Sequence, residues 1–199
     1  MARAHQPDAR RRILDAAVTV FAEHSFEGAR VDQVAKTAGV PKSLIYYHFK
    51  SKEEILEVLF GDFIGEYKEL LRTAGGSGDG SQPQDLAGRL TGHYQAFAFR
   101  NKDLIRIMFI DSLKKSERSP VIFKIVEAML EKEGRPEEEA PCNDDRQKRL
   151  VAEFFTGVVP LYAYLCFSDA WADHFGVEKG RLGELFLDVF GETHGTYHS

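Results

Sequence analysis

Apolar residues recur every three and four positions along most of the chain, which is the spacing of one face of an α-helix. The first such stretch runs from Asp8 to Glu23 and carries Ile13, Leu14, Ala17, Val20 and Phe21. A shorter one follows at 31–38, with Gly39 suited to a helix stop. No segment shows convincing strand alternation, so the sequence predicts an all-α fold.

A third, short helix is predicted to begin at or near Pro41 and to hold the aromatic run "LIYYHF". Ser51 then stands three residues before Glu54, which is the spacing of a capping box that opens a long helix to about Arg72. The first three helices form a head. The last two of them, joined by the glycine-containing "AGVPK", indicate a helix-turn-helix whose second helix can lie in a DNA major groove.

The rest of the chain reads as a larger helical body. Helical patterns are predicted at 85–99, 103–115, 120–133, 146–167 and 179–190. Polar loops at 74–85 and 133–145 interrupt them. Pro160 lacks an N–H and should kink the long helix near Thr156 and Gly157, which could open space beside Phe155. We therefore expect two domains, a helix-turn-helix domain at 1–51 and a helical domain at 52–199.

Charge is distributed unevenly. The 199 residues carry a net charge of −5, which argues against a general polyanion binder. Lys and Arg nevertheless outnumber Asp and Glu within the first 50 residues, so only the head is expected to meet a polyanion. We find no membrane-length apolar run and no signal peptide, and expect a cytoplasmic protein. Cys142 and Cys166 are expected to be free thiols.

The N-terminal end of the third helix is expected to reach base edges. Lys42 and Ser43 stand there, and Leu44 is placed to contact a thymine methyl. Ile45 and Phe49, four residues apart, are expected to point back into the core of the head.

Polar side chains further along the same segment suit phosphate contacts. Tyr46, Tyr47 and His48 can donate hydrogen bonds to phosphates, and Lys52 adds a positive charge beside the start of the next helix. The alternative is that these aromatic residues simply pack within a small helical domain.

These residues carry a resemblance to a known family. The segments "ILDAA..VFAEHSFEG", "VAKTAGV" and "LIYYHFKSKEEIL" occur in order over about 47 residues and resemble the N-terminal domain of the TetR family of bacterial transcriptional regulators. The resemblance covers about a quarter of the chain. It implies an all-helical homodimer with a DNA-binding head and a ligand-binding body that releases DNA when occupied.

The chain departs from the family pattern at two places. Ala29 and Arg30 stand where members usually have Thr or Ser, whose hydroxyl commonly caps the second helix and touches a phosphate. Arg30 can replace the phosphate contact but not the cap. Pro41 to Leu44 also differ from the usual Ser, basic residue, Gly-Ala, so the operator cannot be transferred from a relative.

The last two helices of the body are candidates for a dimer seam. The helix at 146–167 is apolar on more than one face, and the helix at 179–190 carries one apolar stripe, so a four-helix seam is natural. A purely intramolecular core is the alternative. The expected interface residues are Phe154, Val158, Leu161, Leu182, Leu185, Phe186 and Val189.

Aromatic side chains predict a pocket in the body for an apolar or aromatic small molecule. The candidate lining residues are His93, Phe97, Met108, Phe109, Phe155 and Tyr162, although aromatic residues at helical spacing are more often plain core. Three acidic residues could favour a cationic ligand, but a solvated face is the preferred reading for Asp111, Glu127 and Glu153.

Other functions fit less well. The histidines are scattered, no metal-ligand spacing or cofactor fingerprint appears, and no catalytic residues are predicted, so an enzyme is disfavoured. Cys142 could make a redox sensor, against the simpler reading of an exposed thiol. Together with the family resemblance, the sequence predicts a homodimeric repressor that binds operator DNA and is released from it by a ligand. No membrane partner is expected. An activator, or a constitutive DNA binder with a purely structural body, is the alternative.

Overall fold

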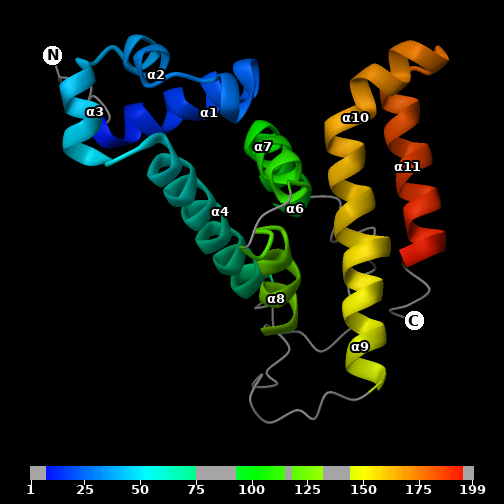
Figure 1. Cartoon of the computed structure of the whole chain (residues 1–199). Helices are drawn as coiled ribbons and strands as arrows, with labels where there is room; N and C mark the ends of the chain where they lie inside the picture. Colours follow the sequence, from blue (N-terminus) through cyan, green and yellow to red (C-terminus); the bar gives the residue numbers. More distant parts are fainter. Residues whose placement is uncertain (1–7, 75–92, 115–117, 132–143, 195–199) are drawn as a thin grey trace, which may run out of the picture. The chain divides into compact units, whose positions relative to one another are not determined.

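The structure is a computed structural model that describes residues 8–74, 93–114, 118–131 and 144–194 (Figure 1). Within these ranges every regular element is a helix, so the predicted all-α class is confirmed. The chain divides into two compact units, Met1–Phe63 and Ile64–Ser199, with the division inside one long helix. The domain boundary that the sequence predicts at residues 51 and 52 stays a prediction.

Unit 1 is built from α1 (Ala9–Gly28), α2 (Val31–Ala38), α3 (Lys42–His48) and the first part of α4 (Lys52–Ala74). The apolar stripe of α1 is buried, as its periodicity predicts, and α1 packs against both α2 and α3. The helix α1 extends to Gly28, past the predicted end at Glu23, and is kinked at Ser25, whose φ of 56° is not helical.

Local signals in the sequence set the helix ends of unit 1. Gly39 ends α2 with a φ of 64°, and its N–H donates to the carbonyls of Ala35 and Lys36. The Oγ of Ser51 accepts a hydrogen bond from the N–H of Glu54 at 3.2 Å, which confirms the predicted cap of α4.

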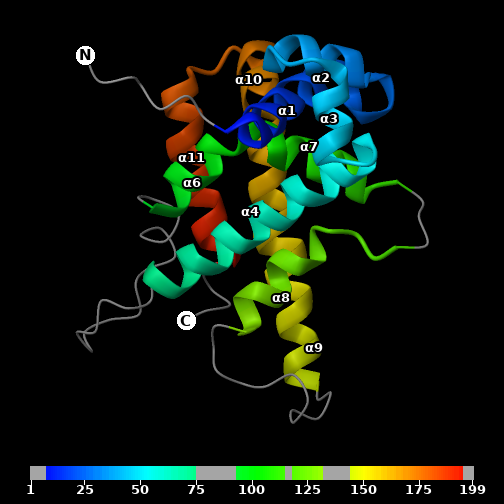
Figure 2. The ribbon, with the colours of Figure 1, turned by 90° about the vertical axis from the view of Figure 1, so that its left-hand side faces the viewer.

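Unit 2 contains the remainder of α4 and the helices of the body. These are α6 (His93–Arg100), α7 (Lys102–Ser112), α8 (Phe123–Glu131), α9 (Asp144–Val151), α10 (Val159–Phe175) and α11 (Lys179–His194). The predicted helix at 85–99 falls partly outside the described residues. The helices α10 and α11 run antiparallel and pack against each other (Figures 1 and 2).

A π-helical segment, Ala152–Val158, joins α9 to α10. Pro160 is the second residue of α10 and has no N–H for the carbonyl of Thr156, and its ring would crowd that carbonyl in α-helical geometry. A wider turn just before a proline relieves this conflict. The kink that the sequence predicts near Thr156 and Gly157 therefore takes the form of a π-helical segment.

The helical stretch Asp144–Phe175 contains an 18-residue window with a mean hydropathy of 1.6, a third of which is buried. By length and composition alone this stretch is long and apolar enough to cross a membrane, whereas no such run was expected from the sequence. Core helices of soluble proteins have the same length and composition. Cys166 in this stretch is a free thiol, and burial raises its pKa.

One carboxylate links three helices of unit 2. Asp169 on α10 lies 2.7 Å from the Nζ of Lys102 at the start of α7 and 2.9 Å from the Nζ of Lys179 at the start of α11. The hydrogen bonds from the two lysines lower the pKa of Asp169 to about 2. This partly exposed cluster connects the N-terminal ends of α7 and α11 to α10.

Candidate nucleic-acid interface and ligand cavity

The helix α3 has one buried and one exposed side. Ile45, and Phe49 just after the end of α3, are buried in unit 1, as predicted. Tyr46 is 51% exposed and Tyr47 is 81% exposed, although large aromatic side chains are usually buried. Packing within the unit therefore does not explain the two tyrosines. The sequence alone leaves that alternative open, and the exposure of both tyrosines favours a surface that meets a partner.

Lys42 is the first residue of α3 and forms an ion pair with α2. Its Nζ lies 2.7 Å from the Oδ1 of Asp32, and the hydrogen bond to this carboxylate raises the pKa of Lys42. Ser43 beside it is exposed, while Leu44 is half-buried. His48 at the end of α3 is half-buried and meets the ring of Tyr47 edge-on, with 5.1 Å between the ring centroids.

Arg30 occupies the N-cap position of α2 and is exposed. Its N–H donates to the Oε1 of Gln33 at 2.8 Å, so the side chain of Gln33 reaches back to satisfy the backbone at the cap. A guanidinium group has no acceptor and makes no cap of its own. Gln33, which the sequence analysis did not single out, thus replaces part of the missing hydroxyl cap.

Lys52 is directed into unit 1. Its Nζ donates to three backbone carbonyls, those of Phe26 at 2.7 Å, Glu27 at 3.3 Å and Ala29 at 3.2 Å. The same group lies 4.5 Å from the centre of the Phe26 ring. An ammonium group has three donors, so these carbonyls account for all of them. A phosphate contact at Lys52, as expected from the sequence, would therefore have to replace these hydrogen bonds to the backbone.

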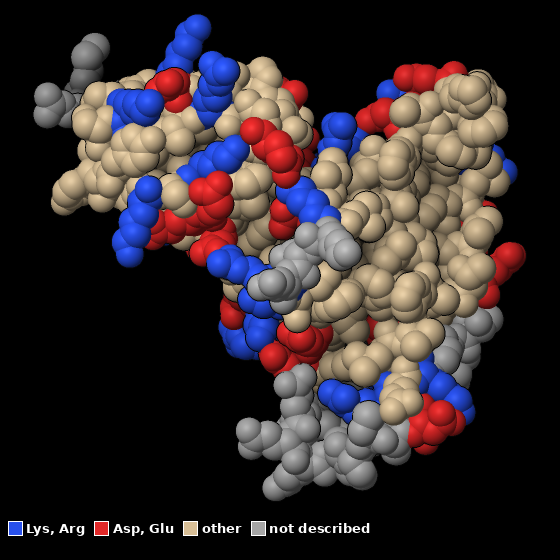
Figure 3. Space-filling model, viewed as in Figure 1, with Lys and Arg blue, Asp and Glu red and all other residues tan. Residues whose placement is uncertain are grey.

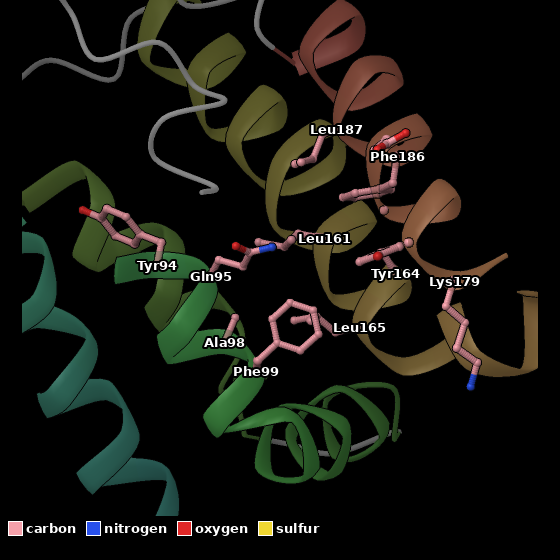
Figure 4. Close-up of a pocket in the computed structure, with 13 residues that line it drawn as sticks. Tyr94, Gln95, Ala98, Phe99, Leu161, Tyr164, Leu165, Lys179, Phe186 and Leu187 are labelled. Carbon is pink, nitrogen blue, oxygen red and sulfur yellow. The ribbon is translucent and has the colours of Figure 1, made fainter. Parts of the chain in front are cut away.

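A cavity of about 320 Å³ lies in unit 2 among α6, α10 and α11 (Figure 4). Its walls are largely apolar and aromatic, which suits an apolar or aromatic molecule. Phe99 projects from α6 toward Leu165 of α10. Tyr164 stacks on Phe186 of α11 with 4.1 Å between ring centroids and 14° between ring planes. Lys179 lies at one end.

Of the six residues predicted from the sequence to bind a ligand, the five whose side chains the structure describes do not line this cavity. Met108 and Tyr162 are buried, and burial raises the pKa of Tyr162. Phe97 lines a more open hollow between α4 and α6, Phe109 is half-buried and Phe155 is 63% exposed. The side chain of His93 lies outside the described part of the structure. These six assignments stay predictions, and the cavity residues Phe99, Tyr164 and Phe186 are new candidates.

The residues predicted at a dimer seam differ in exposure. Val158 is buried, while Leu185 and Val189 on α11 are exposed. The remaining four are half-buried: Phe154, which meets the ring of Phe123 edge-on, Leu161 and Phe186, which line the cavity, and Leu182.

Further exposed apolar residues follow α10 at intervals of four. They are Phe167, Trp171, which is 43% exposed, and Phe175. Figure 3 shows few charged side chains over the middle of α10, whereas acidic and basic side chains gather at its upper end. The helix predicted from the sequence ends at Phe167 and does not include this stripe, although the four-residue spacing in "FSDAWADHF" indicates it.

Two charged or polar residues are buried together at the π-helical segment. Glu153 belongs to this segment, and its Oε2 lies 3.7 Å from the Nε2 of His194, the last residue of α11. The solvated position preferred for Glu153 from the sequence is therefore wrong. By contrast, Glu127 is exposed, and Asp111 pairs with Lys114 at 2.7 Å.

The tautomer of His194 follows from its other contact. The Thr156 hydroxyl donates to the carbonyl of Ala152 at 2.7 Å, so its oxygen is left to accept from the Nδ1–H of His194 at 2.8 Å. Nδ1 therefore carries a proton, and Nε2 faces Glu153. Only a glycine at position 157 permits this approach, because a Cβ there would lie 2.8 Å from the Cε1 of His194.

Comparison with known proteins finds related regulators. Residues 13–59 match the model of the family described as "Bacterial regulatory proteins, tetR family". The HTH-type transcriptional repressor KstR2 of Mycolicibacterium smegmatis is 27% identical over 150 residues, which are 66% of this chain and 71% of that protein. The fatty acid metabolism regulator protein of Bacillus subtilis is 45% identical over 58 residues, 29% of this chain and 30% of that protein.

Solved structures share the fold. The transcriptional regulator FadR from Bacillus subtilis, in complex with stearoyl-CoA, has a TM-score of 0.58 at 23% identity and covers 90% of this chain and 96% of its own. A TetR-like transcriptional regulator from Rhodococcus has a TM-score of 0.56 at 18% identity and covers 94% and 96%. At these identities the likeness is one of fold.

Proposed function

Since this chain carries the N-terminal DNA-binding domain of the TetR family of bacterial transcriptional regulators, we propose that it is a homodimeric repressor. In this proposal α3 of each subunit reads half of an operator. A small apolar or aromatic molecule bound in unit 2 releases the DNA. The proteins that it matches are regulators of transcription and not enzymes.

The observation that carries the proposal is the two-sided α3. Ile45 and Phe49 fix the helix to the core of unit 1, while Lys42, Ser43 and Tyr47 are exposed. A helix with its inner side anchored and a polar outer side is the arrangement that lies in a major groove, with its first residues at the base edges. Exposed tyrosine hydroxyls are suited to phosphate contacts.

Exposed apolar residues on the last two helices support the homodimer. Leu185 and Val189 on α11, and Trp171 and Phe175 on α10, expose apolar surface of the kind that a partner subunit covers. A second copy is the occupant proposed here, because two heads related by a twofold axis read the two halves of a pseudo-palindromic site.

The cavity among α6, α10 and α11 supports the effector. A volume of about 320 Å³ with stacked aromatic rings in its wall suits a planar or apolar molecule. A ligand that releases DNA must bind the DNA-incompetent state more tightly, and by linkage DNA must weaken its binding by the same factor.

Binding to selected DNA tests the function. Rounds of selection from random duplexes should yield a pseudo-palindrome with half-sites about one helical turn apart or somewhat more, roughly 34–36 Å between successive major grooves. Lys42→Ala should weaken binding to this operator by about 1–3 kcal/mol and relax its sequence preference, since a lysine at a base edge discriminates by that amount. Fluorescence anisotropy of a labelled duplex measures both.

Lys68→Ala is the matched control, because it removes the same charge from unit 2, where Lys68 pairs with Glu131 at 2.7 Å. It should leave operator binding unchanged. Equal losses for Lys42→Ala on operator and scrambled DNA would reject its base-reading role. Indole, which is small and aromatic as the cavity of about 320 Å³ requires, is the first effector to add to the preformed complex, and a fall in anisotropy identifies release.

Two alternatives make different predictions. A constitutive DNA binder holds its operator at any concentration of a molecule that occupies the cavity. An activator binds the same DNA but raises transcription from an adjacent promoter in a reporter assay, whereas the proposed repressor lowers it.

A further inference from the structure

The helices α2 and α3 contain one acidic residue, Asp32, which stands on the second position of α2. Its carboxylate is exposed and lies 2.7 Å from the ammonium group of Lys42, at the start of the helix proposed to read DNA. A carboxylate next to a DNA-binding surface lowers the affinity for any polyanion. The presence of Asp32 beside Lys42 therefore needs an explanation other than DNA affinity.

The ion pair between Asp32 and Lys42 is easily exchanged. Both side chains are more than half exposed, and such surface pairs contribute little net free energy. Lys42 is thus able to leave Asp32 when DNA offers a better acceptor. What decides the exchange is the partner that Asp32 finds once Lys42 has left it.

Non-cognate and cognate DNA differ in that respect. On non-cognate DNA that places no guanine opposite Lys42, the strongest acceptor within reach is a phosphate, and Asp32 is left unpaired in the negative potential of the backbone. At a matching base pair, Lys42 can donate to the O6 and N7 of guanine, and a nearby carboxylate can accept from the amino group of a cytosine. Only there does the exchange leave both groups with a partner.

On the basis of the proposed DNA-binding function, we propose that Asp32 is a specificity-determining residue. It withholds Lys42 from the phosphates of non-cognate DNA and releases it to a base edge of the operator. Specificity of this kind comes from a penalty on wrong sequences rather than from tighter binding of the right one.

A purely structural role for Asp32 predicts something else. An acidic residue in the first turn of a helix interacts favourably with the helix dipole. If that were its only role, loss of the charge would destabilise α2, and the affinity for every DNA sequence would fall together with the thermal midpoint of unfolding.

The test compares Asp32→Asn with wild type on the selected operator and on a scrambled duplex of equal length and composition, over a series of salt concentrations. Affinity for the scrambled duplex should rise by up to about fivefold, the upper range for an exposed ion pair. The salt dependence on that duplex should steepen by about one released counterion, because Lys42 becomes free for phosphate. Operator affinity should change less, so the ratio of the two affinities falls.

Asp15→Asn is the matched control, since Asp15 is an exposed carboxylate of unit 1 that pairs with Arg11 at 2.9 Å on α1. It changes the net charge equally and should leave the affinity ratio unchanged. In a Lys42→Met background, Asp32→Asn should raise the affinities for operator and scrambled DNA by the same factor, because only the general repulsion of the carboxylate is removed and the lysine that Asp32 restrains is gone.

Three results would overturn the proposal. The first is an equal change in DNA affinity for Asp32→Asn and Asp15→Asn on both duplexes. The second is a rise in the affinity of Asp32→Asn that is equal for operator and scrambled DNA. The third is a fall in its affinity for both duplexes together with a lower thermal midpoint of unfolding. A wild-type protein that binds selected and scrambled DNA equally would instead overturn the proposed function itself, and the two failures are thereby distinguished.

Discussion

The ammonium group of Lys52 shows how one residue can support either folding or DNA binding. Its three donors meet the carbonyls of Phe26, Glu27 and Ala29, which lie where the chain leaves α1 for α2. Ser25 in the same turn has a φ of 56°, a conformation that a non-glycine residue adopts only when its surroundings hold it. We infer that Lys52 stabilises this turn and with it the start of α2.

Lys52→Met tests this role. The change keeps the aliphatic part of the side chain and removes the donors, so it should lower the free energy of unfolding by about 1–3 kcal/mol, the usual cost of leaving acceptors without a charged donor. Urea denaturation measures this loss. Lys50→Met, at a neighbouring exposed lysine, is the control and should change stability little.

The opposite outcome for Lys52 is equally informative. Unchanged stability, with weaker binding to all duplexes and a shallower salt dependence, would mean that Lys52 contacts phosphate as the sequence suggests.

At the residue scale, the predictions that succeeded rest on local signals. The burial of Ile45 and Phe49 follows from helical periodicity, and the cap at Ser51 follows from a spacing of three residues. The contacts of Lys52 reach back more than twenty residues, and those of His194 reach back about forty. Such partners depend on tertiary packing, which periodicity in a single sequence does not encode.

Among the elements, the π-helical segment Ala152–Val158 was partly predictable, since Pro160 indicates a disturbed helix but not the buried contact of Glu153 with His194. Pro160 makes a disturbance of the helix predictable, because the missing N–H and the ring act on the preceding turn whatever the fold. The buried meeting of Glu153 with His194 was not predictable, since it requires the end of α11 to pack against this segment.

Gly157→Ala tests how tightly the two elements meet. In an exposed helix this change would stabilise by up to about 1 kcal/mol. Here the new methyl group would lie 2.8 Å from Cε1 and 3.0 Å from Nε2 of His194, and the hydrogen bond to Thr156 restrains that ring. We therefore expect a loss of about 1–3 kcal/mol in the free energy of unfolding, as for overpacking in a core.

His194→Ala provides the matched background for this measurement. Without the imidazole ring the added methyl group has room, so Gly157→Ala should become neutral or stabilising there. A loss of the same size in both backgrounds would show that the conflict lies elsewhere in the helix.

The cavity shows where element prediction from sequence stops. The sequence correctly indicates helices rich in aromatic residues, but periodicity alone does not decide which faces meet and where a gap is left. Phe97, Met108 and Tyr162 pack into the interior, whereas Phe99 and Phe186 line the cavity. All five stand at similar helical spacings, so only the packing distinguishes them.

For the whole molecule, the exposed apolar residues on α10 and α11 lead to a prediction about assembly. Leu185→Asp combined with Val189→Asp should give folded monomers, since both side chains are exposed in the subunit but would be buried in the proposed dimer. Charges without partners at the centre of an interface prevent association. Sedimentation velocity measures the mass, and circular dichroism confirms the fold.

A monomer of this kind should also lose most of its operator affinity, because one head alone contacts one half-site. Leu113→Asp is the control. Leu113 follows α7, is 75% exposed and lies on neither α10 nor α11, so this variant should remain dimeric and bind the operator normally. A double variant of α11 that still sediments as a dimer would move the interface away from that helix.

Trp171 gives an independent measure of the same seam, because it is the only tryptophan in the sequence. Its ring lies 4.6 Å from that of Phe175 and is partly exposed in the subunit. If the partner covers this end of α10, the wild-type emission should shift to longer wavelength on dilution below the dissociation constant, as water reaches the indole. The monomeric variant should show the shifted emission at every concentration. Identical spectra for dimer and monomer would place Trp171 outside the interface and confine the seam to α11 and the earlier turns of α10.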